Sequence, residues 1–313
     1  MNKIHQKSKI FIAGHNGLVG RAVHRLLKKK GYKNLYFKSK ISLNLLDQNK
    51  VFSFLKKKKF DLVIIAAAKV GGIKANNTFR AQFIYENLQI QNNLIHGSYL
   101  SDVKNLIFLG SSCVYPKYAK QPIKEEELLT GKLEYTNEPY AIAKIAGIKM
   151  CESYNLQYGT NYKCLMPTNT FGENDNFDLN DSHFIPAIIR KVILAKKKSK
   201  KELKLWGTGK VKREIMYVDD IAEACLFFMN KKTRETLINI GTGYEKTIKF
   251  YANFIKNIIY PELKIKFNYN LLDGTPRKIM NNSLSKKYGW KSKYKVDKLL
   301  TSVIEKIEKK NNF

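Results

Sequence analysis

A glycine-rich segment near the start of the chain constrains the fold more than any other feature of the sequence. Gly14-x-x-Gly17-x-x-Gly20 follows the apolar run 9–13 and precedes residues 18–30, whose apolar side chains recur with helical spacing. Glycines at such a junction permit a tight turn and a close approach of the backbone to a pyrophosphate, which the helix N-terminus then binds. The segment predicts a dinucleotide-binding unit with these contacts: Gly14, His15, Asn16, Gly17, Leu18, Val19 and Gly20.

Short apolar strands alternate with longer helices over the next part of the chain, which is the pattern of βαβ units. The predicted strands lie at 34–38, 61–67, 105–110 and 163–166, and the predicted helices at 47–58, 79–99 and 139–158. We therefore expect an α/β protein built on a Rossmann-type, doubly wound parallel sheet.

Beyond residue 170 the pattern loosens, with polar stretches between fewer regular elements. Residues 214–243 contain a strand, a helix and a further strand, and we expect this unit to return to the main sheet. The prediction is therefore a nucleotide-binding domain of residues 1–170 with 214–243. A smaller, interleaved substrate-binding lobe would take residues 171–213 and 244–313.

The formal charge of +31 raises the question of an anionic partner. Only seven of the 57 basic residues are Arg, and the Lys runs at 28–30, 56–59 and 196–201 fall at predicted helix ends and loops. They lack the interleaved aromatic side chains of a base-stacking groove, and such runs are usually solvated. We expect no nucleic-acid partner. We also expect no membrane partner, because the longest apolar run, 62–68, is too short to span a bilayer.

The cysteines indicate a reducing compartment and no metal site. Cys113, Cys151, Cys164 and Cys225 lack the paired spacing of metal ligands, and they fit free thiols better than a disulfide framework. Residues 1–7 lack the apolar core of a signal peptide, so we expect a cytoplasmic protein. Only Cys113 lies outside an apolar strand or helix pattern.

Two segments bring a hydroxyl, a thiol, a phenol and an amine together. Ser111 and Cys113 follow the predicted strand 105–110, and Tyr140 and Lys144 lie four residues apart, on one face of a predicted helix. An ammonium in that position can stabilise the phenolate and lower the pKa of Tyr140. Tyr140 can then give a proton to an alkoxide as a hydride arrives, and a hydride requires a nicotinamide.

The residues after the second predicted strand bear on which nicotinamide cofactor binds. An Asp or Glu there would favour NAD through the ribose hydroxyl. Lys38-Ser39-Lys40 stands there instead, and two cations suit a 2′-phosphate, so we expect NADP(H). Asp47 either contacts the adenine amine or caps the helix that follows it.

The chain resembles the extended short-chain dehydrogenase/reductases from about residue 8 to about residue 300. Within that family it is similar to the bifunctional enzymes that epimerise GDP-4-dehydro-6-deoxy-D-mannose at C3 and C5 and then reduce its C4 ketone. The resemblance implies a GDP-sugar substrate, NADP(H) and a homodimer. It rests on these strings: Phe11–His15, Ala66–Ile73, Leu109–Cys113, Thr136–Gly147, Met166–Asn169 and Asp273–Lys278.

The resemblance also implies catalytic roles. Tyr140 would protonate the C4 oxygen, Lys144 would support Tyr140 and hold the nicotinamide ribose, and Ser111 would orient the carbonyl. Cys113 and His183 would be the acid and base at C3 and C5, a task that suits a thiol and an imidazole near neutral pH. The plain structural alternatives are a small buried side chain for Cys113 and a helix-start position for His183, where Ser182 or Asp181 makes the better cap.

The implied binding residues complete the predicted site. Beyond the glycine segment, Lys38, Lys40 and Asp47, the cofactor contacts are Leu109, Gly110, Ser112, Lys144, Pro167, Thr168, Asn169, Thr170 and His183. The substrate contacts are Lys191, Trp206, Arg213 and Asp273. Two positions depart from the family pattern, because Asn16 and Lys191 stand where Arg is usual.

Two other functions remain open from the sequence. The first is a different NAD(P)-dependent nucleotide-sugar epimerase or reductase of the same family. A 4,6-dehydratase of this family would carry Thr and an acidic residue where Cys113-Val114 stands, which argues against that reaction. The second is a non-enzymatic relative that binds RNA through its basic surface, which predicts a decayed catalytic pair, whereas Tyr140 and Lys144 are both present.

Overall fold

The computed structural model describes residues 3–179, 181–269 and 274–310. The predicted substrate residue Asp273 lies outside the described residues.

Six parallel strands form the central sheet in the order β2-β1-β3-β4-β5-β9. The order runs outward in both directions from the first strand of the chain, which defines a doubly wound sheet and confirms the predicted fold class. The strands are β1 (Ile10–Ala13), β2 (Leu35–Tyr36), β3 (Leu62–Ile65), β4 (Asn105–Leu109), β5 (Asn161–Pro167) and β9 (Leu237–Ile240). All but β2 consist mainly of buried residues, as expected for strands covered on both faces.

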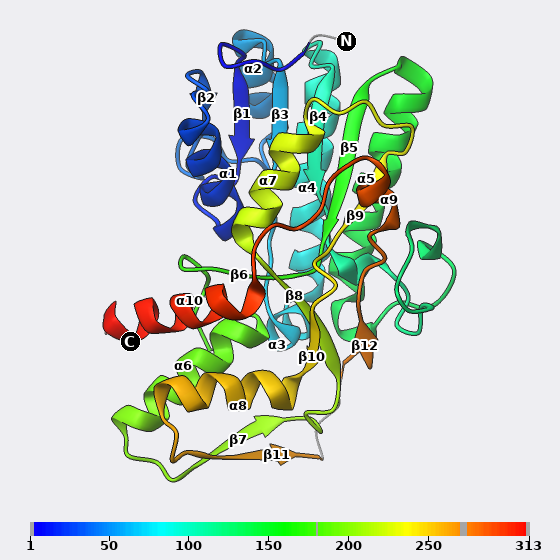
Figure 1. The fold of residues 1–313 in the computed structure, drawn as a ribbon. Coiled ribbons are helices and arrows are strands. Elements are labelled where there is room, and N and C mark those ends of the chain that lie inside the picture. Colours follow the sequence, from blue (N-terminus) through cyan, green and yellow to red (C-terminus); the bar gives the residue numbers. More distant parts are fainter. Residues whose placement is uncertain (1–2, 180, 270–273, 311–313) are drawn as a thin grey trace.

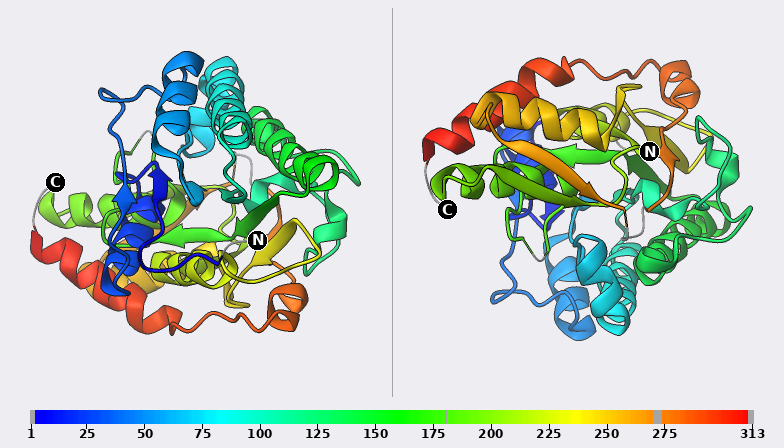
Figure 2. Two further views of the ribbon diagram at one scale, coloured as in Figure 1. Left: turned by 90° about the horizontal axis from the view of Figure 1, so that it is seen from above. Right: turned by 90° about the horizontal axis from the view of Figure 1, so that it is seen from below.

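Helices cover both faces of this sheet (Figures 1 and 2). Successive side chains of a strand point to opposite faces, so Ile10 and Ile12 enter one core while Phe11 and Ala13 enter the other. The first core includes α1 (Leu18–Lys29) and α7 (Val218–Phe228). The second includes α2 (Gln48–Lys58), α4 (Arg80–Leu100) and α5 (Glu138–Tyr158).

A second, smaller group of strands and helices lies below the sheet in Figure 1. Strand β8 (Lys212–Tyr217) is its centre and pairs with β6 (Asn169–Phe171), β10 (Glu245–Thr247) and β12 (Arg277–Lys278). A separate pair joins β7 (Glu202–Trp206) to β11 (Lys264–Asn268). Helices α6 (Phe184–Lys197), α8 (Ile248–Ile259) and α10 (Val296–Lys310) pack here, and α3 (Ile73–Thr78) and α9 (Ser283–Lys287) are short.

The sequence did not predict β7, β10, β12 or the two short helices. Strands β10 and β12 have three and two residues, too few to show an alternating pattern. In β7, Glu202 and Lys204 alternate with two Leu residues, which is the two-residue period of a half-buried strand. A signal for β7 was therefore present in the sequence, whereas only pairing with β8 defines β10 and β12.

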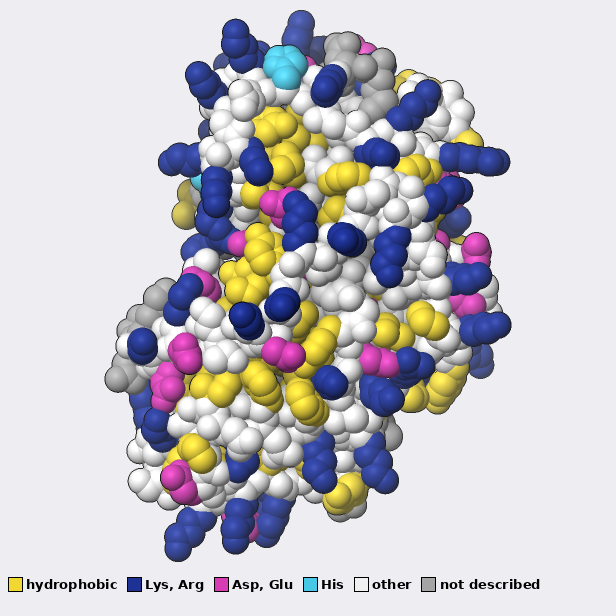
Figure 3. Space-filling model, in the orientation of Figure 1, with side chains coloured by type: hydrophobic (Ala, Val, Ile, Leu, Met, Phe, Trp, Pro, Cys, Tyr) yellow, Lys and Arg dark blue, Asp and Glu magenta, His cyan; other side chains and the backbone are white. Residues whose placement is uncertain are grey.

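The three Lys runs occur at the C-terminal ends of α1, α2 and α6, as the sequence predicts. Figure 3 shows Lys and Arg side chains scattered over one face of the molecule, with acidic and apolar side chains between them. In the part of the chain that the structure describes, no helix is long and apolar enough to cross a membrane.

Candidate active site

One cavity of about 1640 Å³ lies at the carboxyl ends of the strands. Segments that follow β1, β3, β4 and β5 line it on the sheet side, and α6, β7 and β8 contribute residues from the smaller lobe. The crevice outside the carboxyl ends of a parallel sheet is where such folds bind ligands. The cavity therefore has the position expected for a cofactor and a substrate together.

Most of the predicted site residues line this one cavity, although they come from distant parts of the chain. Gly20 and Asp47 do not line it, and Asp273 is not described. The predicted residues that do are Gly14, His15, Asn16, Gly17, Leu18, Val19, Lys38, Lys40, Leu109, Gly110, Ser111, Ser112, Cys113, Tyr140, Lys144, Pro167, Thr168, Asn169, Thr170, His183, Lys191, Trp206 and Arg213.

The glycine segment turns sharply between β1 and α1 and suits a dinucleotide. Gly14 has a φ of +87°, and a Cβ there would lie 2.5 Å from the backbone nitrogen of Ala67. Gly20 serves packing instead, since its Cβ would lie 2.1 Å from the carbonyl oxygen of Gly14. This close fit leaves the N-terminus of α1 facing the cavity, where backbone NH groups can bind a pyrophosphate.

Asp47 acts as a helix cap. Its carboxylate accepts a hydrogen bond from the backbone nitrogen of Lys50 at 3.1 Å and pairs with the Lys50 ammonium at 3.0 Å. These contacts hold the pKa of Asp47 below its usual range. Of the two roles that the sequence left open for Asp47, the structure shows the cap.

Positive charge gathers beside the glycine segment, at the expected adenine end. Lys38 and Lys40 line the cavity there, as the sequence predicts. Arg21 carries no signal in the sequence, and its Nε donates to the carbonyl oxygen of Asn16 at 2.8 Å. The His15 ring stacks on Phe37 with centroids 4.7 Å apart, and its buried Nδ1 has no partner in the described structure. Burial, then His24 and Arg21, lower the pKa of His15.

The Tyr140–Lys144 pair lies on α5 against the end of β4. Lys144 is 3% exposed, and its Nζ donates to the carbonyl oxygen of Leu109 at 2.8 Å. The same Nζ lies 5.9 Å from the centre of the Tyr140 ring, and burial lowers the pKa of Lys144 to about 8. Burial, followed by the Cys113 sulfur, raises the pKa of Tyr140, while a hydrogen bond with Ser111 opposes this shift. The expected lowering of this pKa by Lys144 is therefore wrong for the structure without cofactor, in which burial outweighs the ammonium.

A second group of ionisable side chains lies beside this pair. Cys113 belongs to a single helical turn, Ser112–Val114, which Ser111 caps by accepting a bond from the Cys113 backbone nitrogen at 3.3 Å. Lys278 Nζ lies 3.5 Å from Cys113 Sγ. The His183 side chain is exposed to the cavity. The protein around the ring displaces part of its water, and this, then the Lys278 charge, lower the pKa of His183, which favours a neutral imidazole. Lys278 thus contacts the Cys113 thiol and also acts electrostatically on the His183 imidazole.

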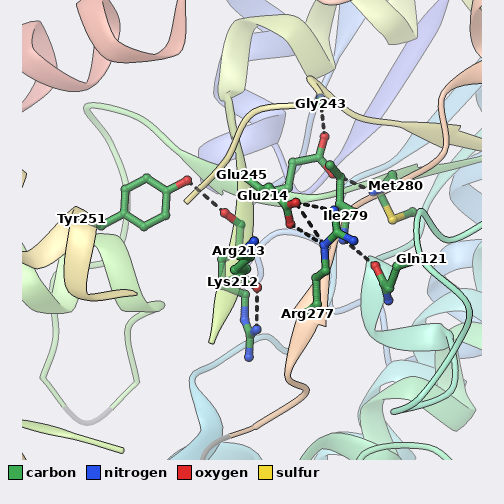
Figure 4. Close-up of polar contacts among 10 residues, drawn as sticks. All are labelled: Gln121, Lys212, Arg213, Glu214, Gly243, Glu245, Tyr251, Arg277, Ile279 and Met280. Atoms are coloured by element: carbon green, nitrogen blue, oxygen red, sulfur yellow. Dashed lines mark hydrogen bonds and ion pairs between the residues drawn. The ribbon is translucent and has the colours of Figure 1, made fainter. Parts of the chain in front are cut away.

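The sequence assigned Lys278 no role, and the smaller lobe explains its place. Glu214 is fully buried, and its carboxylate accepts from the backbone nitrogens of Gly243 and Met280 at 2.7 and 2.8 Å (Figure 4). Arg277 pairs with Glu245 of β10, on the far side of β8, as Figure 4 shows. These contacts fix β12, which carries Lys278, and no local sequence signal reveals them.

The predicted substrate residues form the outer part of the cavity. Lys191 Nζ lies 5.9 Å from the Trp206 ring, and burial lowers the pKa of Lys191. Trp206 is 55% exposed and so presents an open aromatic surface. The backbone carbonyl of Arg213 accepts from the Tyr251 hydroxyl at 2.9 Å, which anchors β8 at this point (Figure 4).

His183 occupies the first position before α6 and makes no capping bond through its side chain. The backbone of His183 therefore occupies the helix-start position, but its side chain does not cap the helix. Cys151, Cys164 and Cys225 are fully buried, as predicted from their apolar surroundings. Among the described residues, no group of three or more His, Cys, Asp or Glu is placed to hold a metal ion.

The sequence matches the model of the NAD dependent epimerase/dehydratase family over residues 10–241. The chain belongs to this family. GDP-L-fucose synthase 1 of Arabidopsis thaliana is 49% identical, over 92% of this chain and 89% of that protein.

Two solved structures have the same fold over nearly the whole chain. A GDP-6-OMe-4-keto-L-xylo-heptose reductase from C. jejuni is 39% identical, with a TM-score of 0.93 and coverage of 99% of this chain and all of that one. A GDP-L-fucose synthetase from Naegleria fowleri, solved with NADP bound, is 27% identical, with a TM-score of 0.88 and coverage of 97% and 93%.

Proposed function

We propose that this chain converts GDP-4-dehydro-6-deoxy-D-mannose into GDP-L-fucose, by epimerisation at C3 and C5 and reduction at C4. The observation that carries the proposal is the placement of two kinds of machinery in one cavity. A Ser–Tyr–Lys group for ketone reduction lies beside a Cys–Lys–His group for proton transfer. The similarity to GDP-L-fucose synthases over about nine-tenths of the chain supports the same reaction.

The epimerisations require protons to leave and return at carbons next to the C4 ketone. Each deprotonation gives an enolate, whose charge Ser111 and Tyr140 can stabilise through hydrogen bonds to the C4 oxygen. Cys113 and His183 then act on opposite faces of the sugar, one as base and the other as acid. Lys278 adds a positive charge beside both groups while negative charge develops.

The cavity also suits the reduction. NADPH, when bound, supplies the hydride to C4. Tyr140 delivers the proton to the C4 oxygen, and the nearby Lys144 ammonium offsets the charge left on the phenolate. Two features suit NADP(H). The sharp glycine turn offers hydrogen-bond donors to a pyrophosphate. A 2′-phosphate needs positive charge, which is present on Arg21, Lys38 and Lys40.

A second candidate is a 4-keto reductase for a GDP-heptose. The C. jejuni relative named above matches the fold with a TM-score of 0.93, and its printed title gives such a substrate. The two candidates differ in the length of the sugar beyond C5 and share the C4 chemistry. Comparing the two substrates in one assay separates them.

Three further expectations belong to the proposal. We propose that residues 1–170 with 214–243 form the nucleotide-binding domain and that the remaining residues form the substrate-binding lobe. The pairing of β9 with β5 supports this division, whereas residues 214–217 belong to β8 at the centre of the smaller lobe. A homodimer would use the outer faces of α4 and α5, where Tyr85 and Ile142 are 62% and 42% exposed. A cytoplasmic location is supported by four cysteines that are all free.

The test is NADPH oxidation by the purified chain with GDP-4-dehydro-6-deoxy-D-mannose, with the corresponding GDP-4-keto-heptose and with NADH in parallel. Formation of GDP-L-fucose, with NADPH preferred, is the expected result. Faster turnover of the heptose would establish the second candidate. Dinucleotide binding without reduction of either ketone would contradict both.

A further inference from the structure

We propose that the loop Lys69–Gly72 is a positioning element that sets the place of His183. This inference rests on the proposed function, in which His183 transfers protons at C3 and C5. The loop follows β3 and lines the cavity, and neither the reaction nor the cofactor assigns it a role.

A buried asparagine fixes the first end of the loop. Asn87 of α4 is 2% exposed, accepts from the backbone nitrogen of Lys69 at 2.9 Å and donates to the carbonyl oxygen of Lys69 at 3.0 Å. Its Nδ2 also donates to the Phe83 carbonyl at 2.7 Å. Lys69 Nζ pairs with Glu86 at 2.9 Å, so both the backbone and the side chain of Lys69 are attached to α4.

A second buried asparagine fixes the other end. Asn76 of α3 is 5% exposed, and its Nδ2 donates to the carbonyl oxygens of Gly71 and Gly72 at 2.7 and 3.1 Å. Two amide side chains thus hold a four-residue loop at both ends. Because each uses a backbone group of the loop, the loop has little freedom to shift along the cavity wall.

The middle of the loop touches the segment that leads into His183. The backbone nitrogen of Gly72 donates to the carbonyl oxygen of Asp181 at 3.0 Å. A Cβ on Gly72 would lie 2.6 Å from the carbonyl oxygen of Ser182, and a Cβ on Gly71 would lie 2.0 Å from Asp181 Oδ1. Gly72 has ordinary extended angles, with φ −69° and ψ 179°, so glycine is required here for space.

A shift of Ser182 at this contact would move the His183 imidazole directly. His183 follows Ser182 and starts α6, where its carbonyl oxygen accepts from the Ala187 nitrogen at 3.0 Å. A Cβ on Gly72 would push Ser182 away and carry the first turn of α6 with it. A proton transfer requires the base within hydrogen-bond reach, so a displacement of about 1 Å is expected to cost up to about 100-fold in rate.

Gly72→Ala tests this role, with Gly131→Ala as the matched control. A Cβ on Gly131 meets Pro116 Cβ at 3.4 Å and nothing closer, so the same substitution is tolerated there. Deuterium uptake at C3 and C5 in heavy water, with NADP⁺ bound, reports proton transfer without reduction. Oxidation of GDP-L-fucose by NADP⁺ reports hydride transfer without epimerisation.

We expect Gly72→Ala to slow deuterium uptake by at least tenfold, with hydride transfer, the Kd for NADPH and the KM for the GDP-sugar within about twofold of the unmodified chain. Asn76→Ala should give the same selective loss, since it releases both carbonyls of the loop. Uptake at the unmodified rate in both variants, or an equal loss of uptake and hydride transfer in both, would overturn the positioning role. Failure of the unmodified chain to take up deuterium would overturn the proposed function instead.

Discussion

Lys278 Nζ lies 3.5 Å from Cys113 Sγ, although 165 residues separate the two side chains in the sequence. Lys278 is 8% exposed, and among the described residues no carboxylate forms an ion pair with it. A buried cation is costly unless other groups compensate its charge. Its contact with the thiol and its effect on the pKa of His183 support the proposal that Lys278 assists proton transfer.

Lys278→Met is expected to reduce deuterium uptake at C3 and C5 by about 100-fold, the usual scale for a group that assists proton transfer. The substitution also removes one cause of the lowered pKa of His183, so that pKa should rise toward 6.5. The base is the neutral imidazole, so deuterium uptake should increase as the pH rises through the pKa of His183. The midpoint of this increase should lie at a higher pH in the variant than in the unmodified chain. Lys249→Met, on the exposed face of α8, is the control. An unchanged pH profile would contradict the role.

Cys113→Ser tests the epimerase assignment. The hydroxyl keeps the size of the side chain but is a much weaker acid and nucleophile than the thiol. We expect deuterium uptake to fall by about 100-fold or more while the Kd for NADPH stays constant. Cys151→Ser, at a buried cysteine away from the cavity, separates this loss from a general effect on folding. Uptake at the unmodified rate would remove Cys113 from the reaction.

Tyr140→Phe should stop net oxidation of NADPH, because it removes the hydroxyl that we propose protonates the C4 oxygen as the hydride arrives. Deuterium uptake should persist in part, since Cys113 and His183 remain in place. The measurement is absorbance loss at saturating GDP-sugar, with uptake followed by mass spectrometry. Reduction at an undiminished rate would show that Tyr140 is not the proton donor.

Reduction should depend on pH through Lys144. Burial lowers its pKa to about 8, so the ammonium that supports Tyr140 is present below that pH and lost above it. The kcat for reduction should therefore fall as the pH rises through about 8. Lys144→Arg should move this fall to higher pH, because a guanidinium stays charged throughout the range. A fall at the same pH in the variant would assign it to another group.

Arg21→Ala tests the adenine end of the cavity. The Arg21 guanidinium is held at the carbonyl oxygen of Asn16, in the glycine segment, and Lys38 and Lys40 line the cavity next to that segment. A 2′-phosphate would gain from a third cation there. We expect the KM for NADPH to rise about tenfold and the KM for NADH to stay nearly constant, as for the loss of one charge-assisted hydrogen bond. Arg234→Ala, at an exposed arginine elsewhere, is the control. An equal rise for both cofactors would mean that Arg21 only shapes the loop.

The site divides into residues that carry a local signal and residues that do not. Tyr140 and Lys144 are recognisable because their spacing on one helix fixes their common face. Gly14 is recognisable because a turn between a strand and a helix restricts the residue that fits. Lys278 and Arg21 have no such mark, since each acquires its importance from a neighbour that the fold supplies.

Asp47 is a residue whose local sequence signal allowed two different roles. Its position before a predicted helix was compatible with an adenine contact and with a cap, and only the bond from the Lys50 nitrogen shows that it is a cap. The short strands β10 and β12 were likewise undetectable, because two or three residues show no period and only pairing with β8 defines them.

The sequence by itself determined the parallel doubly wound sheet and its main helices, the glycine turn and the Tyr140–Lys144 pair. These follow from local periodicity and from steric limits on single residues, which the chain carries wherever it is placed. The tertiary structure alone decided that Cys113, Lys278 and His183 meet, and that Gly72 lies against Ser182. Such contacts join segments of different elements through long-range packing and buried hydrogen bonds, which no local pattern of residues specifies.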